Sequence, residues 1–523
     1  MALPKPAYKI LLFISPLAGL LCALAFPPFN LWPILIAGLV FLWLACRGLS
    51  GRRSFLLGLL WGVGLYLGAM YWLCYVMVNY GGLPPALSIL LLFLLCLYLA
   101  LYPAGAVFLT VWLDQYRLPR WFSAPLIWMG LECVRGYAVT GFPWLPLSLS
   151  LSAWPLWLQS AELWGGLGLS GCLVLLSALI AQALSGEKKA ALYLLPALAL
   201  LAGGGGGGAL RLSSLAQDMS QTPSLSVSIV QGNIGLDSLW NRSLRYQHIL
   251  KEIGLTYQAA GQARERPWLV LWPESAAPFA FLYDVDNSIP VLQAAADLRA
   301  YIALGTVGIV ENGQKQSNRL YLIDPSGQPL AHYDKVHLVP FGEYVPWSQF
   351  LFFVRAVAAL SVDMAAGEEG KVLPGGEFTA GPLICYESIF PELSRALKRS
   401  GADLLINPTN DAWFGPSTAS SQHLSHLVLR AVENRLSCAR SANTGISAFI
   451  LPDGQVLAAT ELFREAVETR DIPLLRQDTF YSQYAEIFEY TFMSGAGLAL
   501  LAVLVRAAVR AGRILPNLFT GKR

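Results

Sequence analysis

The sequence predicts a protein of two parts: a membrane bundle of about eight transmembrane α-helices and an extracytoplasmic α/β sandwich domain. The first observation is composition, since 55% of the 523 residues are hydrophobic and only 13% are charged, compared with about 25% charged residues in soluble proteins. The second is that long apolar runs precede residue 211, whereas short β-branched runs follow residue 222. A net charge of +3 without a basic stripe argues against nucleic acid as a partner.

Eight apolar runs approach the roughly 20 residues that cross a bilayer as a helix. They lie at residues 8–26, 32–46, 54–78, 86–113, 122–142, 162–184, 190–210 and 492–509, and the second of them is short. The predicted organisation follows from these runs: seven transmembrane helices at 1–211, the α/β domain at 222–480, a final transmembrane helix at 490–512 and a basic tail at 513–523.

Lysine and arginine are concentrated in every second connection between the runs, as at Arg52, Arg53, Arg117 and Arg120, whereas the loops "PPFNLWP" and "VNYGGLPP" contain neither. Because basic loops stay in the cytoplasm, both termini are predicted to be cytoplasmic and the α/β domain to lie outside. Six consecutive glycines, 203–208, fall late in the seventh run. They indicate a hinge, close helix packing or a low-complexity expansion tolerated at a helix end.

The second part alternates between strand and helix patterns. Short β-branched runs bounded by Gly, Pro, Asn and Asp predict strands, in "LSVSIVQGNI", "PWLVLWPES", "YIALGTVGIV", "NRLYLIDPSGQ", "GPLICYES", "ADLLINPTN" and "GISAFILPDGQ". Helical patterns intervene near 240–261, 288–299, 390–400 and 420–436. This alternation is typical of a layered α/β sandwich, and the turns in "LIDPSGQPL" and "LPDGQVL" favour hairpins and therefore a mixed sheet.

Three polar residues stand where strand patterns end, which is where α/β folds place their chemistry. They are Glu274 in "LVLWPESAAP", Lys335 in "HYDKVHLVP" and Cys385 in "LICYES". Taken alone, each has an ordinary interpretation, as a helix-capping carboxylate, a surface lysine and a packed thiol. Together they suit nucleophilic catalysis, with a base, a stabilising cation and a thiol. His332 and His337 lack further ligands at metal-binding spacing, so we expect no metal.

Other reactive side chains have plainer interpretations. Glu132 and Arg135, three residues apart in the fifth run, are predicted to pair on one helix face in or near the membrane. His423 and His426 lie on a helical pattern and are interpreted as non-ligand residues. Cys438 is expected to be a core thiol, and the spread of the eight cysteines does not indicate a disulfide framework.

Glu274, Lys335 and Cys385 occur in this order within the motifs "PE", "DK" and "CYE". This order resembles the carbon-nitrogen hydrolase (nitrilase) superfamily over about residues 225–470. The resemblance implies a nitrilase-like α-β-β-α sandwich. It also implies that Cys385 is a nucleophile and not a packing residue.

With the membrane helices included, the whole chain resembles the bacterial apolipoprotein N-acyltransferase family. The stretches that carry this resemblance include "LAFPPFNLWP", "TGFPW", "VQGNI", "HLVPFGEYVP" and "NPTNDAWFG". The resemblance implies that Glu274 is the base, Lys335 the stabilising cation and Cys385 the acylated nucleophile. Supporting roles are implied for six further residues: Trp240, Glu343, Tyr386 and Glu387, and less firmly Asn318 and Trp144.

The same resemblance implies an acyl donor that is a glycerophospholipid, with phosphatidylethanolamine expected, and an acceptor that is a diacylated apolipoprotein. No cofactor is implied. The implied location is the bacterial inner membrane, with the catalytic domain on the periplasmic side.

Two alternatives stay open from the residues. A membrane-tethered amidase would release its acyl group to water, and a transporter or receptor could carry an inactive enzyme-like domain. Eight apolar runs argue against the first, and the intact Glu, Lys and Cys set argues against the second. The apolar segment at 350–364 is interpreted either as an amphipathic lid that dips into the membrane or as an ordinary packed helix.

Overall fold

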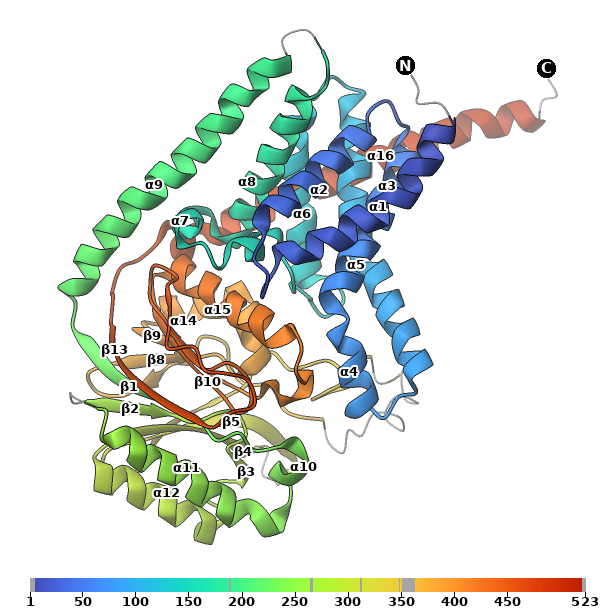
Figure 1. The fold of residues 1–523 in the computed structure, drawn as a ribbon. Helices are drawn as coiled ribbons and strands as arrows, with labels where there is room; N and C mark the ends of the chain where they lie inside the picture. Colours follow the sequence, from blue (N-terminus) through green and yellow to red (C-terminus); the bar gives the residue numbers. More distant parts are fainter. Residues whose placement is uncertain are drawn as a thin grey trace.

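The computed structural model describes residues 5–187, 190–263, 267–310, 313–347, 349 and 363–519. A helical part lies above an α/β part, and both ends of the described chain lie at the far side of the helical part (Figure 1). Most of the predicted lid segment, residues 350–362, falls outside the described residues.

Each of the eight predicted spans contains helix, but the third, 54–78, is divided into two helices, Gly51–Met70 and Trp72–Asn79. The helices of the upper part are α1 (Lys5–Cys22), α2 (Trp32–Ala45), α3 (Gly51–Met70), α4 (Trp72–Asn79), α5 (Pro85–Asp114), α6 (Arg120–Tyr137), α7 (Pro155–Leu158), α8 (Ala161–Ala183), α9 (Leu194–Ser220) and α16 (Phe480–Phe519). Six of them, α1, α3, α5, α8, α9 and α16, are long and apolar enough to cross a membrane. A membrane bundle is therefore confirmed, whereas the number of eight spans stays a prediction, because α2 is short and α6 is not among the six.

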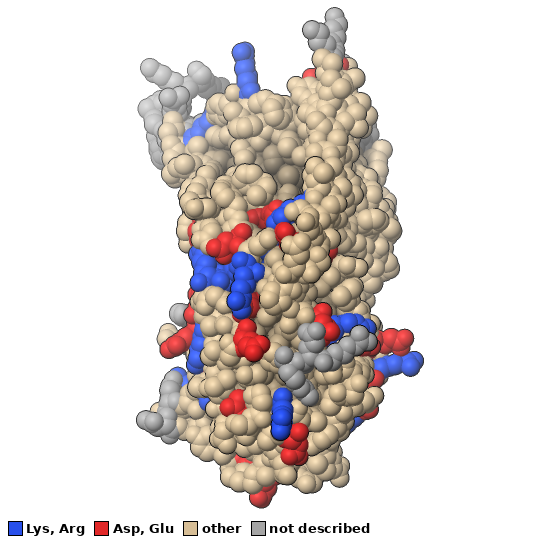
Figure 2. Space-filling model, turned by 90° about the vertical axis from the view of Figure 1, so that its left-hand side faces the viewer, with Lys and Arg blue, Asp and Glu red and all other residues tan. Residues whose placement is uncertain are grey.

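The surface divides in the same way as the sequence. Figure 2 shows that the helical part exposes few charged side chains on the face in view, whereas Lys, Arg, Asp and Glu are spread over the junction and the α/β part. Apolar side chains such as Phe13, Ile89 and Leu195 are more than half exposed. Such a surface is stable when it faces lipid and not water.

Two helices extend beyond the predicted apolar runs. α9 continues to Ser220, and α16 begins at Phe480, about ten residues outside each run. In α9 the extension is held by Arg211, which donates two hydrogen bonds to the Glu162 carboxylate and forms a 2.9 Å ion pair with it. A polar contact at the membrane boundary therefore prolongs a helix that hydropathy alone ends earlier.

The glycine run lies inside the continuous helix α9 and is not a hinge. A Cβ atom built on Gly208 would lie 1.9 Å from the carbonyl oxygen of Leu156, in α7, whereas one on Gly206 would meet nothing within 4 Å. Close helix packing thus explains Gly208, and nothing in the structure explains Gly206.

The α/β part is a sandwich of two mixed sheets. The strands are β1 (Ser224–Gln231), β2 (Trp268–Leu271), β3 (Ala277–Ala280), β4 (Tyr301–Val310), β5 (Lys315–Ile323), β6 (Pro329–Asp334), β7 (Leu373–Pro374), β8 (Thr379–Pro382), β9 (Leu404–Thr409), β10 (Ser437–Ala442), β11 (Ala448–Ile450), β12 (Val456–Leu457) and β13 (Ala466–Pro473). The first sheet has the order β13-β1-β2-β4-β5-β6, with β3 beside β4, and the second has the order β12-β11-β10-β9-β8-β7. Parallel pairs such as β1 with β2 occur beside antiparallel pairs such as β4 with β5, which confirms the predicted mixed pairing.

Helices cover both outer faces of the sandwich (Figure 1). The first sheet carries α11 (Arg245–Ala260) and α12 (Val285–Leu298), and the second carries α14 (Pro391–Arg399) and α15 (Ala419–Asn434). Strand side chains such as Val227, Leu271, Leu404 and Phe449 pack together between the two sheets. The layers are therefore α-β-β-α, as predicted.

The helical part and the α/β part share one apolar core, since residues of α15 such as Leu427 pack in the same cluster as Leu173 of α8. Polar contacts also cross this junction; in one of them, the Gln422 side-chain oxygen accepts the indole N–H groups of Trp144, at 2.8 Å, and Trp72, at 3.3 Å. α16 then packs on α6 and α8. There a Cβ on Gly130 would lie 2.3 Å from the Phe492 carbonyl oxygen, so only glycine admits this approach.

We expect Gly208→Ala to lower the free energy of unfolding by about 1–3 kcal/mol, because the added methyl group cannot be accommodated without moving α9 from α7. Gly206→Ala is the matched control and should raise stability by up to about 1 kcal/mol, because alanine favours the helix. Thermal unfolding of the two variants in detergent compares them, and equal midpoints would contradict the packing role of Gly208.

Candidate active site

The three predicted catalytic residues come together although they follow strands of two different sheets. Glu274 lies just beyond β2 and Lys335 directly follows β6, both in the first sheet, while Cys385 lies just beyond β8 in the second. All three side chains are buried, with 7%, 1% and 8% of their surface exposed. The two sheets therefore bring a carboxylate, an ammonium group and a thiol into one enclosed place.

Lys335 lies between two carboxylates. Its Nζ atom is 2.9 Å from Glu343 Oε1 and 3.5 Å from Glu274 Oε1. Burial by itself would lower the pKa of Lys335, but Glu343 and Glu274 outweigh it and raise the pKa above its ordinary value. The lysine is therefore a permanent cation at neutral pH.

Asn318 completes this network. Its side-chain N–H groups donate to Glu274 Oε1, at 2.7 Å, and to Glu343 Oε1, at 3.0 Å, and its backbone carbonyl accepts the backbone N–H of Lys335 at 2.8 Å. The other oxygen of Glu274 accepts the backbone N–H of Asn410, at 3.0 Å, from the loop after β9. The position of the Glu274 carboxylate is thus set by groups from both sheets.

Cys385 is not part of a strand, contrary to the predicted strand over "GPLICYES". β8 ends at Pro382, and Cys385 begins a short 3-10 turn, Cys385–Ile389, with φ of +52°. Left-handed backbone at a residue other than glycine costs about 1–3 kcal/mol and is frequent at functional sites. The turn replaces strand pairing because the Glu387 carboxylate folds back and accepts the backbone N–H of Ile384 at 2.6 Å.

The thiol of Cys385 is protonated at rest. Burial raises its pKa, the neighbouring Glu274 carboxylate raises it further, and Lys335 only partly opposes them. A thiol in this setting needs a base at the moment of reaction, and Glu274 is the carboxylate that acts on it most strongly.

Glu387 braces the turn that carries Cys385. Its other oxygen accepts the Val336 N–H at 2.7 Å, the His337 N–H at 3.1 Å and the Tyr333 hydroxyl at 2.9 Å. Burial raises the pKa of Glu387 to about 7, although Lys335 and the backbone donors lower it. Glu387 therefore joins the turn to the segment that begins with Lys335.

An aromatic wall lies beside Cys385. Tyr386 stacks at 6.5 Å on Trp144, which is buried and comes from the helical part. Phe414 contacts Trp144 edge to face at 6.1 Å. Trp413 is part exposed and contacts Tyr80, at the end of α4, so these two aromatic residues face the helical part.

Trp240 stands apart from the other predicted residues. It follows α10 (Leu236–Leu239) and is 47% exposed, and none of its described interactions joins it to Glu274, Lys335 or Cys385. The structure thus brings Asn318, Glu343, Tyr386, Glu387 and Trp144 to the three central residues and leaves Trp240 at the surface.

Sequence patterns missed a buried polar cluster beneath Cys385. His423 Nε2 lies 2.9 Å from the Cys385 carbonyl oxygen, and Nδ1 lies 2.9 Å from Asp411 Oδ1. Arg440 donates to Asp411 at 2.7 Å and to the Asn407 side-chain oxygen at 2.5 Å. His423 thus contacts the backbone carbonyl of Cys385. The residues around His423 in the sequence, on a helical pattern, do not predict that contact.

The charges in this cluster balance one another. Burial alone would raise the pKa of Asp411, but Arg440 and His423 hold it well below its usual value. Burial and Arg440 lower the pKa of His423, which Asp411 opposes. Cys438 is a second thiol in the α/β part. It is fully buried in the apolar core, as predicted. Within the described residues, no group of three His, Cys, Asp or Glu side chains could hold a metal ion.

Comparison with known proteins identifies two family models in this chain. Residues 18–179 match the apolipoprotein N-acyltransferase N-terminal domain, and residues 226–478 match the carbon-nitrogen hydrolase domain. The apolipoprotein N-acyltransferase of Geobacter metallireducens is 34% identical, over 97% of this chain and 97% of its own. That of Photobacterium profundum is 32% identical, over 96% of both chains.

Among solved structures, an amidase from Nesterenkonia sp. matches with 24% sequence identity and a TM-score of 0.38. The match covers 51% of this chain and 96% of the amidase chain.

We expect the alkylation rate of Cys385 by iodoacetamide to rise about tenfold per pH unit from pH 7 to 9, without levelling. A raised thiol pKa means that the thiolate fraction is small throughout this range and grows tenfold with each unit. Peptide mass spectrometry of Cys385 against pH measures the rate. A plateau near pH 7 would mean that the resting thiol is already ionised.

We expect His423→Leu to lower the free energy of unfolding by about 1–3 kcal/mol, because Asp411 and the Cys385 carbonyl each lose a buried partner. His423→Gln should recover part of this loss, since its amide can donate to the carbonyl. His332→Leu, at a side chain 40% exposed, is the control and should leave the thermal midpoint unchanged. A midpoint for His423→Leu equal to that of the parent would exclude a positioning role.

Proposed function

This chain belongs to the apolipoprotein N-acyltransferase family and is an N-acyltransferase of the membrane, and from that premise we propose how its residues perform the reaction. The acyl donor is a glycerophospholipid, with phosphatidylethanolamine as the expected lipid. The acceptor is the α-amino group of the S-diacylglyceryl-cysteine at the N-terminus of an apolipoprotein. The acyl group passes through a thioester on Cys385.

In the first half-reaction Glu274 takes the thiol proton, and the sulfur of Cys385 attacks the ester carbonyl carbon of the lipid. Lys335 and the backbone N–H that follows Cys385 stabilise the oxyanion. The carbon–oxygen bond of the ester then breaks, and Glu274 returns the proton to the leaving alkoxide. The products are a thioester on Cys385 and a lysophospholipid.

In the second half-reaction the acceptor amine attacks the thioester carbonyl carbon. Glu274 takes a proton from the attacking nitrogen, the carbon–sulfur bond breaks, and the thiolate of Cys385 is reprotonated. An amide forms, which is more stable than the thioester, so the transfer needs no nucleotide. Because the lysophospholipid leaves before the acceptor reacts, the kinetics are ping-pong.

One observation carries this proposal: the thiol of Cys385 is buried beside one carboxylate and one permanent cation. Glu274 is suited to move the proton because Asn318 and the Asn410 N–H orient its carboxylate. Glu343 keeps Lys335 in place, and Glu387 holds the turn of Cys385. The aromatic wall of Tyr386 and Trp144 offers an apolar surface for an acyl chain and excludes water, which would otherwise hydrolyse the thioester.

We further propose that the protein lies in the bacterial inner membrane with both termini in the cytoplasm. The catalytic domain is then on the periplasmic side, because the basic loops between the helices lie on the cytoplasmic side. Trp240 is assigned to substrate binding, since its exposed indole is free to meet a lipid or a lipopeptide.

The test is intact-protein mass spectrometry of the full chain mixed with phosphatidylethanolamine. We expect one acyl mass that hydroxylamine removes, that is absent from Cys385→Ala and that Cys438→Ala retains. Glu274→Gln should slow its formation by about 10²–10⁴-fold, because general base catalysis contributes that much. When a diacylated lipopeptide with a free amine is then added, the protein should lose the acyl mass and the lipopeptide should gain it.

Two results would contradict the proposal. An adduct that forms only from small amides and is released to water would identify a membrane-tethered amidase. An adduct that persists in Cys385→Ala would place the nucleophile elsewhere.

A further inference from the structure

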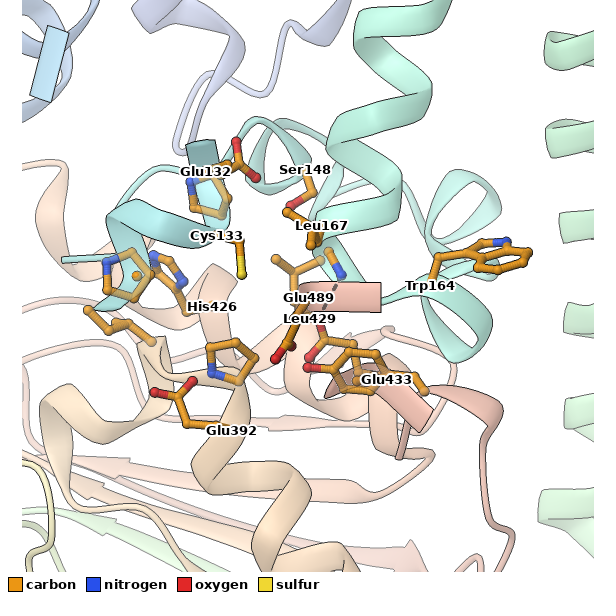
Figure 3. A pocket seen from close by; sticks show the side chains of 18 of the residues that line it. Glu132, Cys133, Ser148, Trp164, Leu167, Glu392, His426, Leu429, Glu433 and Glu489 are labelled. Carbon is orange, nitrogen blue, oxygen red and sulfur yellow. Dashed lines mark hydrogen bonds between the residues drawn. The ribbon is translucent and has the colours of Figure 1, made fainter. Parts of the chain in front are cut away.

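A cavity with several buried polar side chains in its wall lies at the junction of the two parts, apart from Cys385. α6 and α8 of the helical part, α14 and α15 of the catalytic part and α16 surround it. Figure 3 shows Glu132, Cys133, Ser148, His426, Glu392, Glu433 and Glu489 around this space. Its volume is about 80 Å³, whereas one buried water needs about 10–15 Å³ by the same measure. It can therefore hold a polar group of several atoms.

Buried donors in the cavity wall lack partners. His426, Arg135 and Ser148 are 1%, 2% and 0% exposed and line the cavity. His426 Nε2, Arg135 Nε and Nη2, and Ser148 Oγ form no hydrogen bond within the described structure. Each buried polar atom left unpaired costs about 1–3 kcal/mol. Groups of this kind gathered on one cavity indicate that a polar occupant completes their hydrogen bonds.

The predicted pair of Glu132 and Arg135 is not formed, which leaves the arginine available. Glu132 instead accepts the Ser170 hydroxyl at 2.6 Å and the Leu147 N–H at 3.3 Å. Within the described residues, Arg135 donates only through Nη1, to the Tyr66 hydroxyl at 2.6 Å. Glu132 is therefore satisfied by neighbouring segments, whereas Nε and Nη2 of Arg135 remain for an anionic group.

The opposite wall has spare negative charge. Two of its carboxylates are matched by arginines, since Arg430 pairs with Glu433 at 2.7 Å and Arg395 with Glu489 at 2.9 Å. Glu392 forms no ion pair with any residue that the structure describes. Burial and the nearby Glu489 raise the pKa of Glu392 to about 7, although a backbone hydrogen bond, Arg395 and Arg430 lower it. Both arginines form their ion pairs with other carboxylates. An ammonium group beside Glu392 would supply a paired cation.

The mouth of the cavity is built for a membrane interface. Tyr137 at the end of α6 and Trp164 near the start of α8 line it and are 47% and 46% exposed. Tyrosine and tryptophan are enriched where spans meet lipid headgroups. The apolar side chains of Leu163, on α8, and Ile487, on α16, are also exposed. Both helices are apolar enough to span a membrane.

We propose that this cavity binds the headgroup of a zwitterionic aminophospholipid from the surrounding bilayer. The phosphate faces Arg135, His426 and Ser148, and the ammonium group faces Glu392. The acyl chains leave through the mouth between Tyr137 and Trp164 along the apolar surfaces of α8 and α16.

This lipid is not the acyl donor, and the inference does not rest on the proposed reaction. Glu274, Lys335 and Cys385 do not line the cavity. Trp144 separates the two sites, since its ring contacts His423, beneath Cys385, and His426, in the cavity wall. The lipid would instead hold α6 of the helical part against α14 and α15 of the catalytic part. On α15, His426 in the cavity wall lies about one helix turn from His423, beneath Cys385.

Cys133 lines the cavity and reports its occupancy. The experiment uses the full chain with Cys385→Ala, because this change removes the proposed acyl transfer. The protein is freed of lipid in detergent and treated with N-ethylmaleimide. Peptide mass spectrometry then measures the labelling of Cys133. We expect phosphatidylethanolamine to slow this labelling several-fold, and phosphatidylglycerol to do so only at higher concentration. Inorganic phosphate alone should not protect, which separates a lipid headgroup from a free anion.

Two variants locate the headgroup. Glu392→Gln should raise the phosphatidylethanolamine concentration for half-protection about tenfold and leave that for phosphatidylglycerol unchanged, because a charged partner is lost. His426→Leu should weaken protection by both lipids. Glu461→Gln, at an exposed carboxylate, is the matched control and should behave as the parent.

The proposal is overturned if phosphatidylethanolamine leaves the labelling of Cys133 unchanged in the parent. It is equally overturned if Glu392→Gln, with an unaltered thermal midpoint, is protected at the parent's lipid concentration. Equal protection by phosphatidylglycerol or by inorganic phosphate would exclude recognition of the zwitterionic headgroup.

Discussion

A buried ammonium group between two carboxylates is the interaction on which the catalytic half depends. Lys335 is 1% exposed, and an ion buried so fully costs several kcal/mol unless it is paired and hydrogen-bonded. Glu343 and Glu274 supply the pairing, and Asn318 bonds both carboxylates. Since Glu274 also accepts the Asn410 N–H from the second sheet, the network that pairs the lysine also joins the ends of the two sheets. The geometry of the site therefore depends on how the two sheets pack.

The same network sets the state of the thiol. A carboxylate and a cation act on Cys385 with opposite signs, while burial disfavours the thiolate. The resting protein therefore keeps a neutral thiol, with the Glu274 carboxylate and the Lys335 ammonium group held nearby by their own hydrogen-bond partners. This arrangement limits unwanted alkylation or oxidation of the cysteine, because the thiolate is the reactive form.

Much of this could be predicted from the sequence, because long apolar runs and short β-branched runs have distinct periods. The spans, the strands β1, β4, β5 and β9 and the four helices of the sandwich follow from those patterns. The turn at Cys385 could not be predicted so, since "GPLICYES" has a strand pattern and the hydrogen bond from Ile384 to Glu387 overrides it. His423 was missed for a related reason: its partner is a backbone carbonyl, which leaves no trace in residue types.

The close approach of α16 to α6 at Gly130 has a consequence for biogenesis. Translation runs from the N-terminus, so α16 leaves the ribosome only after every strand of the sandwich has been made. Until then, the notch at Gly130 and the neighbouring faces of α6 and α8 lack their last partner. Assembly of the membrane part therefore finishes after synthesis of the catalytic part, and a chain cut short within the sandwich lacks the helix that packs on α6 and α8.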